Sequence, residues 1–277
     1  MSHDSSKLIA FNYFGGKLTW TDWLYKYFPK HVHFIDVFGG SMAVTLNKPL
    51  SRINTYNDIN GDVVNFFRVL RDYPRELITQ LLLTPISRQE YNECWGDVDE
   101  PVERARRFYV RVRQSMFSMG GQQKNKGWRL SKAKTDVWGG EVVSLWWNSI
   151  PKLIEISDRL MSLQIENRCF RELIPLLDFA EAFFYLDPPY PVESRASKND
   201  YRFDFTDNDH IDLATVARAA TGMVMISSYD CGLMRELYGD WEMVAFPSKR
   251  NNIRSGLVQE CIWMNYEHKE QLTLFNN

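Results

Sequence analysis

The sequence lacks the features that mark membrane, secreted and metal-binding proteins. It has no uninterrupted run of about 18 apolar residues, the length that a membrane-spanning helix needs. Its first residues lack the basic and then apolar order of a secretion signal, so we expect a cytoplasmic protein. The few cysteines form no C-x-x-C pair, which argues against a zinc site or a disulfide framework. They are Cys94, Cys169, Cys231 and Cys261. We therefore predict no metal centre.

An excess of positive charge is also missing. The chain has 33 Lys and Arg against 35 Asp and Glu, a formal net charge of -2. Proteins that coat nucleic acid through bulk charge are usually basic. The basic residues instead gather between Arg104 and Lys134, interleaved with aromatic residues. Any contact with nucleic acid must therefore be local.

The hydrophobic content, at 44%, is enough for a sizeable core in the 277-residue chain. The patterns predict a strand over 32–38, a helix over 41–48, a strand over 53–58 and a helix over 60–71. Such a β-α-β unit binds its ligand beyond the carboxyl ends of the strands. Strands return at 163–166, 183–186, 223–227, 242–246 and 258–263. These patterns predict an α/β fold.

Between residues 73 and 160 the sequence shows no strand pattern and instead has several patterns typical of helix N-termini. Ser87 with Glu90 fits a capping box, and Pro101 fits the first turn of a helix with an apolar stripe. We expect an exposed basic loop over 120–140 and one tryptophan-rich helix over 142–161. The predicted division is an α/β domain made of residues 1–75 and 155–277, with a helical insert over 76–154.

The most specific motif is Asp187-Pro188-Pro189-Tyr190, directly after the predicted strand at 183–186. An aspartate at the end of a strand, held by two prolines of fixed φ and followed by an aromatic ring, forms a rigid acceptor beside a stacking surface. A planar amine suits such a site. Alone, the tetrapeptide could also be a turn that only ends the strand.

Two further acids follow predicted strands. Asp36 precedes Phe38-Gly39-Gly40-Ser41, where glycines would let a ligand approach the backbone, although a helix start without a ligand has the same pattern. The dinucleotide fingerprint G-x-G-x-x-G is absent. Asp58 follows about 20 residues later, the usual separation for a ribose ligand, although it could instead cap the next helix.

Ahead of the first strand stands Tyr13-Phe14-Gly15-Gly16-Lys17, which does not satisfy the phosphate-loop pattern G-x-x-x-x-G-K-[ST]. Taken in order along nearly the whole chain, these motifs resemble the Dam-like class of DNA adenine methyltransferases, particularly the versions common in bacteriophages and mobile elements. Residues 165–170 and 226–230 add to the resemblance. It implies a Rossmann-like methyltransferase sheet that uses S-adenosylmethionine, with a helical target-recognition insert.

The resemblance implies a role for each matching residue. Asp187, Pro188, Pro189, Tyr190 and Lys17 would form the catalytic site, where Asp187 and the Pro188 carbonyl accept the amino hydrogens of an extruded adenine stacked on Tyr190. The cofactor would be held by Tyr13, Phe14, Gly15, Gly16, Lys17, Asp36, Phe38, Gly39, Gly40, Ser41, Met42, Asp58, Ile59, Cys169, Phe170 and Asp187. Two of these depart from the family pattern: Met42 replaces a usual glycine, and Cys169 replaces a usual acid before Phe170.

Double-stranded DNA is the partner that the resemblance implies. We expect contacts from the insert and from a basic loop over 248–256, although a solvated basic face is a common alternative. The expected residues are Arg111, Arg113, Gln122, Lys124, Lys126, Arg129, Lys132, Lys249, Arg250 and Arg254. The alternatives are a methyltransferase for the cytosine 4-amino group or an RNA amine, and an inactive DNA-binding relative. The recognition sequence, a restriction-modification partner and the oligomeric state stay open.

Overall fold

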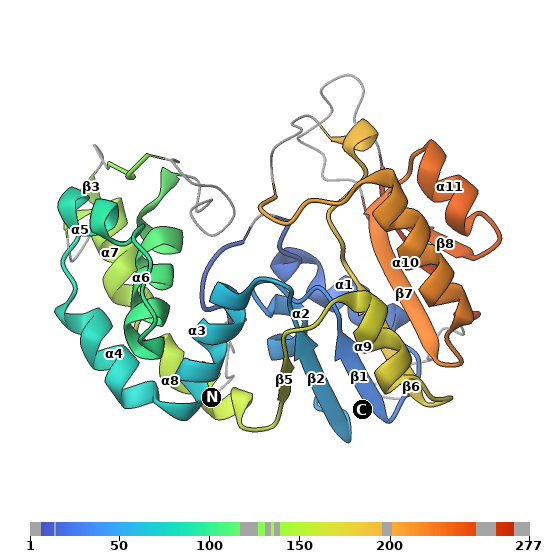
Figure 1. Ribbon diagram of the computed structural model, residues 1–277, viewed down its shortest axis with the longest axis horizontal. Helices are drawn as coiled ribbons and strands as arrows, with labels where there is room; N and C mark the ends of the chain where they lie inside the picture. The colour runs from blue at the N-terminus through green and yellow to red at the C-terminus, as the bar shows by residue number, and fades with distance from the viewer. Residues whose placement is uncertain are drawn as a thin grey trace, which may run out of the picture.

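A seven-stranded sheet forms the centre of the larger part of the molecule (Figure 1). The computed structural model describes residues 7–13, 15–116, 127–130, 134–135, 139–195, 201–247 and 259–268. The strand order is β5-β2-β1-β6-β7-β9-β8. The strands are β1 (His33–Asp36), β2 (Ile53–Asn57), β5 (Gln164–Glu166), β6 (Ala182–Leu186), β7 (Met223–Tyr229), β8 (Glu242–Ala245) and β9 (Glu260–Met264).

The five strands from β5 to β7 are parallel, whereas β9 runs antiparallel to both β7 and β8. Asp36 at the end of β1 pairs in register with Tyr56 of β2 and with Tyr185 of β6. The carboxyl ends of these strands therefore meet at one edge, where ligands bind in open parallel sheets. The predicted α/β fold is confirmed.

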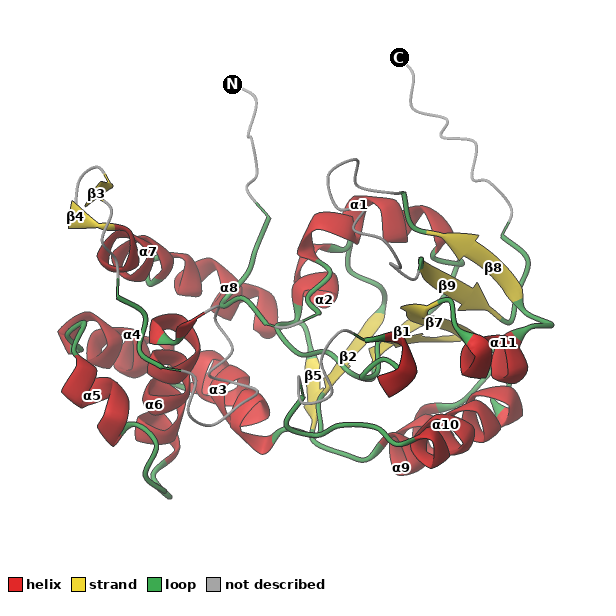
Figure 2. Cartoon of the chain, turned by 90° about the horizontal axis from the view of Figure 1, so that it is seen from above, coloured by secondary structure: helices red, strands yellow, loops and turns green. Residues whose placement is uncertain are grey.

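Helices cover both faces of the sheet, as the view from above shows (Figure 2). Because successive side chains of a strand point to opposite faces, Phe184 of β6 packs towards one set of helices and Phe183 towards the other. One face carries α9 (Phe170–Leu177), α10 (Asp207–Ala219) and α11 (Gly232–Tyr238), and the other carries α1 (Thr21–Leu24) and α2 (Ala43–Asn47).

The remaining helices gather to one side of the sheet, at the left of Figure 1. They are α3 (Gly61–Asp72), α4 (Pro74–Leu83), α5 (Arg88–Glu93), α6 (Pro101–Gln114), α7 (Glu141–Ser149) and α8 (Lys152–Leu160). One hydrophobic core joins them, with Phe66 of α3 against Phe108 and Tyr109 of α6. Since α3 and α8 share this core with the predicted insert, the division at 75 and 155 stays a prediction.

Two details differ from the sequence-based expectations. The single helix expected over 142–161 is two helices, because Pro151 disfavours helical backbone in the residue before it and lacks an N–H. The loop expected over 120–140 includes a short antiparallel pair, β3 (Lys134–Thr135) with β4 (Gly139–Gly140). Among the described residues, no helix combines the length and apolarity needed to cross a membrane.

Candidate active site

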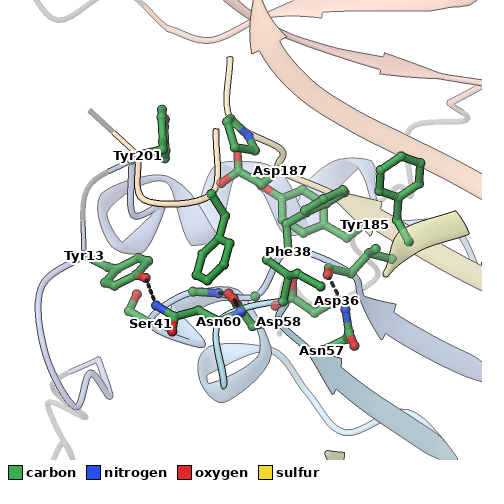
Figure 3. A pocket seen from close by; sticks show the side chains of 18 of the residues that line it. Tyr13, Asp36, Phe38, Ser41, Asn57, Asp58, Asn60, Tyr185, Asp187 and Tyr201 are labelled. Atoms are coloured by element: carbon green, nitrogen blue, oxygen red, sulfur yellow. Dashed lines mark hydrogen bonds between the residues drawn. The ribbon is translucent and has the colours of Figure 1, made fainter. Parts of the chain in front are cut away.

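A pocket of about 270 Å³ opens at the carboxyl ends of β1, β2 and β6 (Figure 3). Its wall combines five aspartates, three of them at strand ends, with aromatic rings and backbone. Asp36, Asp58 and Asp187 come from the ends of three neighbouring strands, and Tyr13 and Tyr201 face them from loops. The pocket can therefore hold a ligand that has both polar groups and flat apolar rings.

Asp36 is buried, and only one of its two carboxyl oxygens has a hydrogen-bond partner among the described residues. Its Oδ2 accepts a hydrogen bond from Thr45 Oγ1 at 2.6 Å, while its Oδ1 has no partner among the described residues. Burial raises the pKa of the Asp36 carboxyl to about 7. A buried acceptor without a partner is costly, so this oxygen suits a donor or a cation supplied by a ligand.

Asp58 is held by backbone rather than by side chains. Its Oδ1 accepts from the Asn60 N–H at 2.7 Å, and its Oδ2 accepts from the Gly40 N–H at 2.8 Å. Burial raises the pKa of Asp58 to about 6, although these two N–H groups act in the opposite direction. The alternative that Asp58 caps α3 is wrong, because the cap is Asn60, whose side chain accepts from the Asp62 N–H.

Glycines form the turn between β1 and α2. A Cβ on Gly39 would lie 2.1 Å from the Tyr56 ring, and Gly40 has a φ of +48° with the Tyr13 ring beside it. Only glycine fits at Gly39 without a rearrangement of its neighbours. Met42 is the one non-glycine residue with positive φ among the described residues, at 61°, and its side chain is buried in the helical core.

Asp187 lies at the centre of a buried polar cluster. Lys17 Nζ lies 2.8 Å from both carboxylate oxygens, and Ser227 Oγ donates to Oδ1 at 2.8 Å. Burial lowers the pKa of Lys17, but the carboxylates of Asp187 and Glu260 outweigh it and hold this pKa above its usual value. The charged lysine therefore favours the carboxylate form of Asp187, although burial still holds the pKa of Asp187 above its usual value.

Tyr190 packs behind this cluster and is almost fully buried. Its hydroxyl donates to Glu260 Oε1 at 2.6 Å, and its ring lies 5.0 Å from Lys17 Nζ and against the Tyr229 ring. Neither Tyr190 nor Pro188 lines the pocket, whereas Pro189 does. The stacking role of Tyr190 stays a prediction.

The other end of the pocket is aromatic. The rings of Phe38, Phe170 and Phe205 pack together with centroids 5.6–5.9 Å apart. Cys169 lines the same wall, with its sulfur 3.7 Å from the Arg171 guanidinium. This wall suits a flat ring.

Most of the expected cofactor residues line this one pocket. They are Tyr13, Gly15, Gly16, Lys17, Asp36, Phe38, Gly39, Gly40, Ser41, Asp58, Ile59, Cys169, Phe170 and Asp187. Met42 points into the core instead, and Phe14 lies outside the described residues. Across the described ranges, no group of three or more His, Cys, Asp or Glu side chains could hold a metal ion.

Only some of the residues expected to contact DNA lie within the described part of the chain. Arg111 pairs with Asp62 at 3.1 Å and donates to the Cys94 carbonyl, and Arg113 donates to the Leu145 carbonyl. Arg129 is described near the end of α6, where its N–H donates to the Gln114 carbonyl. The others, Gln122, Lys124, Lys126, Lys132, Lys249, Arg250 and Arg254, lie outside the described residues.

Several residues of the site were not assigned a role from the sequence. Asn57 donates to the Val37 and Arg168 carbonyls and so joins the ends of β1, β2 and β5. Because Asn57 precedes Asp58 at the end of a predicted strand, the sequence pattern could have indicated that Asn57 belongs to the site. Glu260 gave no such signal, because it starts an antiparallel strand far along the chain.

The comparisons with known proteins agree with this geometry. A family model described as D12 class N6 adenine-specific DNA methyltransferase matches residues 13–252. The chain is also similar to the Type II methyltransferase M1.LlaDCHI of Lactococcus lactis subsp. cremoris, with 26% identity over 268 residues that cover 86% of this chain and 87% of that protein. The resemblance seen in the sequence is confirmed: the chain belongs to the D12 class of N6 adenine-specific DNA methyltransferases.

Proposed function

We propose that this DNA adenine methyltransferase uses S-adenosylmethionine as its methyl donor and acts on an adenine extruded from the duplex beside Asp187. The observation that carries the proposal is the single pocket that joins Asp187 to Asp36 and Asp58. An amine acceptor and a candidate cofactor site are thereby connected through one cavity.

The residues present fit this methyl donor. The Oδ1 of Asp36, which has no partner in the described part of the chain, would pair with the ammonium of its methionine part, and Asp58 would accept from its ribose hydroxyls. Gly39 and Gly40 leave room for its approach, and Phe170 offers a ring for the adenine part to pack on. When bound, S-adenosylmethionine supplies a methyl group on a positively charged sulfur.

Asp187 and Pro188 would orient the target amine. The Asp187 carboxylate and the Pro188 carbonyl would accept the two amino hydrogens of adenine and direct the nitrogen lone pair into the pocket. Asp187 would also oppose the positive charge that develops on this nitrogen, an effect that is stronger inside a pocket than in open water. Lys17 and Ser227 fix the carboxylate in place.

Base extrusion is needed because an adenine inside a duplex cannot present its amino group to a carboxylate that lines a pocket. The cost of unpairing and unstacking is about a few kcal/mol. We propose that the Tyr190 ring stacks on the extruded base, and that the helical part over 76–154 contacts the surrounding duplex.

The test is transfer of labelled methyl from S-adenosylmethionine to unmethylated duplex DNA, followed by digestion to nucleosides. We expect label in 6-methyladenine, and a decrease in rate of at least about 100-fold in Asp187→Ala, because an electrostatic group is removed from the reacting nitrogen. Asp158→Ala, an exposed aspartate on α8, is the matched control and should keep full activity. Label in cytosine, or none from a protein that binds both cofactor and DNA, would contradict the proposal.

A further inference from the structure

A second carboxylate lies beside Asp187, on a strand that runs opposite to those that carry the rest of the site. Glu260 begins β9, and the antiparallel register places it opposite Tyr229 at the end of β7. It accepts from the Tyr190 hydroxyl at 2.6 Å and lies 3.4 Å from Lys17 Nζ. Glu260 also falls outside the range 13–252 that the family model matches. The motifs that identify the family therefore assign it no role.

The Lys17 ammonium is shared between the two carboxylates. Its side chain is 4% exposed, and it also donates to the Gly15 carbonyl at 2.9 Å. One buried cation between Asp187 and Glu260 leaves a surplus of one negative charge. Removal of either carboxylate would change the net charge of this cluster and the position of the lysine within it.

Lys17 occupies the oxygens that the target amine needs. It contacts both oxygens of Asp187, and Ser227 donates to one of them as well. A carboxylate offers about four acceptor positions, and Lys17 and Ser227 already use three of them. An amino group that binds at the remaining position would lie beside the ammonium and compete with it for the same oxygens. A buried ammonium cannot give up a partner without a replacement. Glu260 is already close enough to provide one.

We propose that Glu260 is a positioning residue, which draws the Lys17 ammonium away from Asp187 when the adenine amino group binds and holds the Tyr190 ring through its hydroxyl. The inference rests on the proposed function, because it assumes that an amine binds to Asp187.

Three variants separate the two contacts of Glu260. Glu260→Gln removes the charge at constant size, Glu260→Asp keeps the charge, and Tyr190→Phe removes only the hydroxyl bond. We expect kcat to fall about 100-fold in Glu260→Gln, as for a displaced active-site group, with the KM for S-adenosylmethionine unchanged. Glu260→Asp should recover part of this loss, and Tyr190→Phe should lose less than Glu260→Gln. Glu236→Gln, on an exposed position of α11, controls for the change in charge.

A second measurement needs no substrate. In protein with ¹⁵N-labelled lysine, a pH titration reports the pKa of Lys17, whose signal is identified by its loss in Lys17→Arg. This pKa should be lower in Glu260→Gln than in the wild type, because one of the two carboxylates that raise it is neutral.

The outcomes separate the inference from the proposed function. If the wild type methylates adenine and Glu260→Gln keeps its kcat within about twofold, or loses no more than Tyr190→Phe, the role in positioning Lys17 is wrong. If the pKa of Lys17 shifts as expected but no variant methylates adenine, wild type included, the proposed function has failed and the inference falls with it.

Discussion

The three pocket aspartates that lie at strand ends have surroundings that suit different tasks. Asp187 is paired with the Lys17 ammonium, Asp58 is held by two backbone N–H groups, and Asp36 has one oxygen without a described partner. Burial raises the pKa of all three carboxyls, and at Asp187 a lysine in direct contact opposes this rise. The ionisation of Asp36 and Asp58 should therefore depend on the ligand.

Cofactor binding should weaken in mild acid. The pKa is about 7 for Asp36 and about 6 for Asp58, and in both cases burial favours the neutral acid. If the ligand needs both carboxylates ionised, each must lose its proton on binding, so affinity should fall as the pH drops through these values. The decrease is at most about tenfold per pH unit for each group.

Calorimetric titration with S-adenosylhomocysteine between about pH 5 and about pH 8 measures this linkage. Asp36→Asn should bind more weakly at the upper end and lose the part of the pH dependence near neutrality. An affinity that stays level across this range in the wild type would show that neither carboxyl changes its ionisation on binding.

At the scale of single elements, the turn from β1 into α2 combines backbone strain with burial. Met42 adopts a left-handed backbone at the start of α2, and its side chain lies in the core formed with the helices. The sequence pointed to this residue as a departure from the family glycine. The sequence could not show that the Met42 side chain is packed in the core, which is the contact that could offset the backbone strain.

Replacement of Met42 by glycine should destabilise the protein. Relief of the left-handed conformation gains about 1–2 kcal/mol, whereas loss of a buried methionine side chain costs about 2–5 kcal/mol. The loss of buried contacts therefore outweighs the relief of strain. In urea unfolding, Met42→Gly should be less stable than the wild type, and Met42→Ala less stable still, because alanine keeps the strain. A Met42→Gly protein more stable than the wild type would mean that strain dominates.

At the scale of the whole molecule, Asp62 joins three separate parts. It lies in the first turn of α3 and pairs with Arg104 and Arg111 of α6 and with Arg202, which follows β6 in the chain. These guanidiniums hold the pKa of Asp62 below its usual value, even though burial acts to raise it. The arginines of α6 that seemed available for DNA are thus used in part to attach the helices to the pocket side of the sheet.

Asp62→Ala should lower the free energy of unfolding by about 1–3 kcal/mol, because it leaves guanidiniums without their shared acceptor. Since the folded pKa is depressed, this contribution is present above the unfolded pKa near 3.8 and is lost as the pH falls through the folded value. Urea unfolding at neutral and acid pH measures the loss of stability and its dependence on pH, with Asp158→Ala as the exposed control. Equal stability of the two variants would show that the ion pairs of Asp62 do not stabilise the contact between α3, α6 and Arg202.

Much of the fold follows from local sequence pattern. The apolar runs placed each strand of the large sheet to within a few residues, and the polar residues after β1, β2 and β6 indicated the edge at which Asp36, Asp58 and Asp187 meet. Both signals are local, because the period of a strand and the residues that end it lie within one short segment. The ordered motifs also determined the family, which the comparisons confirm.

Only the tertiary structure decided which distant groups become partners. The antiparallel return of β9 brings Glu260 to Lys17 and Tyr190, and the packing of α3 against α6 brings Asp62 to the arginines. Neither pairing leaves a periodic trace in the sequence, because each depends on how elements far apart in the chain pack. The sequence thus determined the fold class, the family and the three acids at the strand ends, whereas packing determined which charges pair with one another.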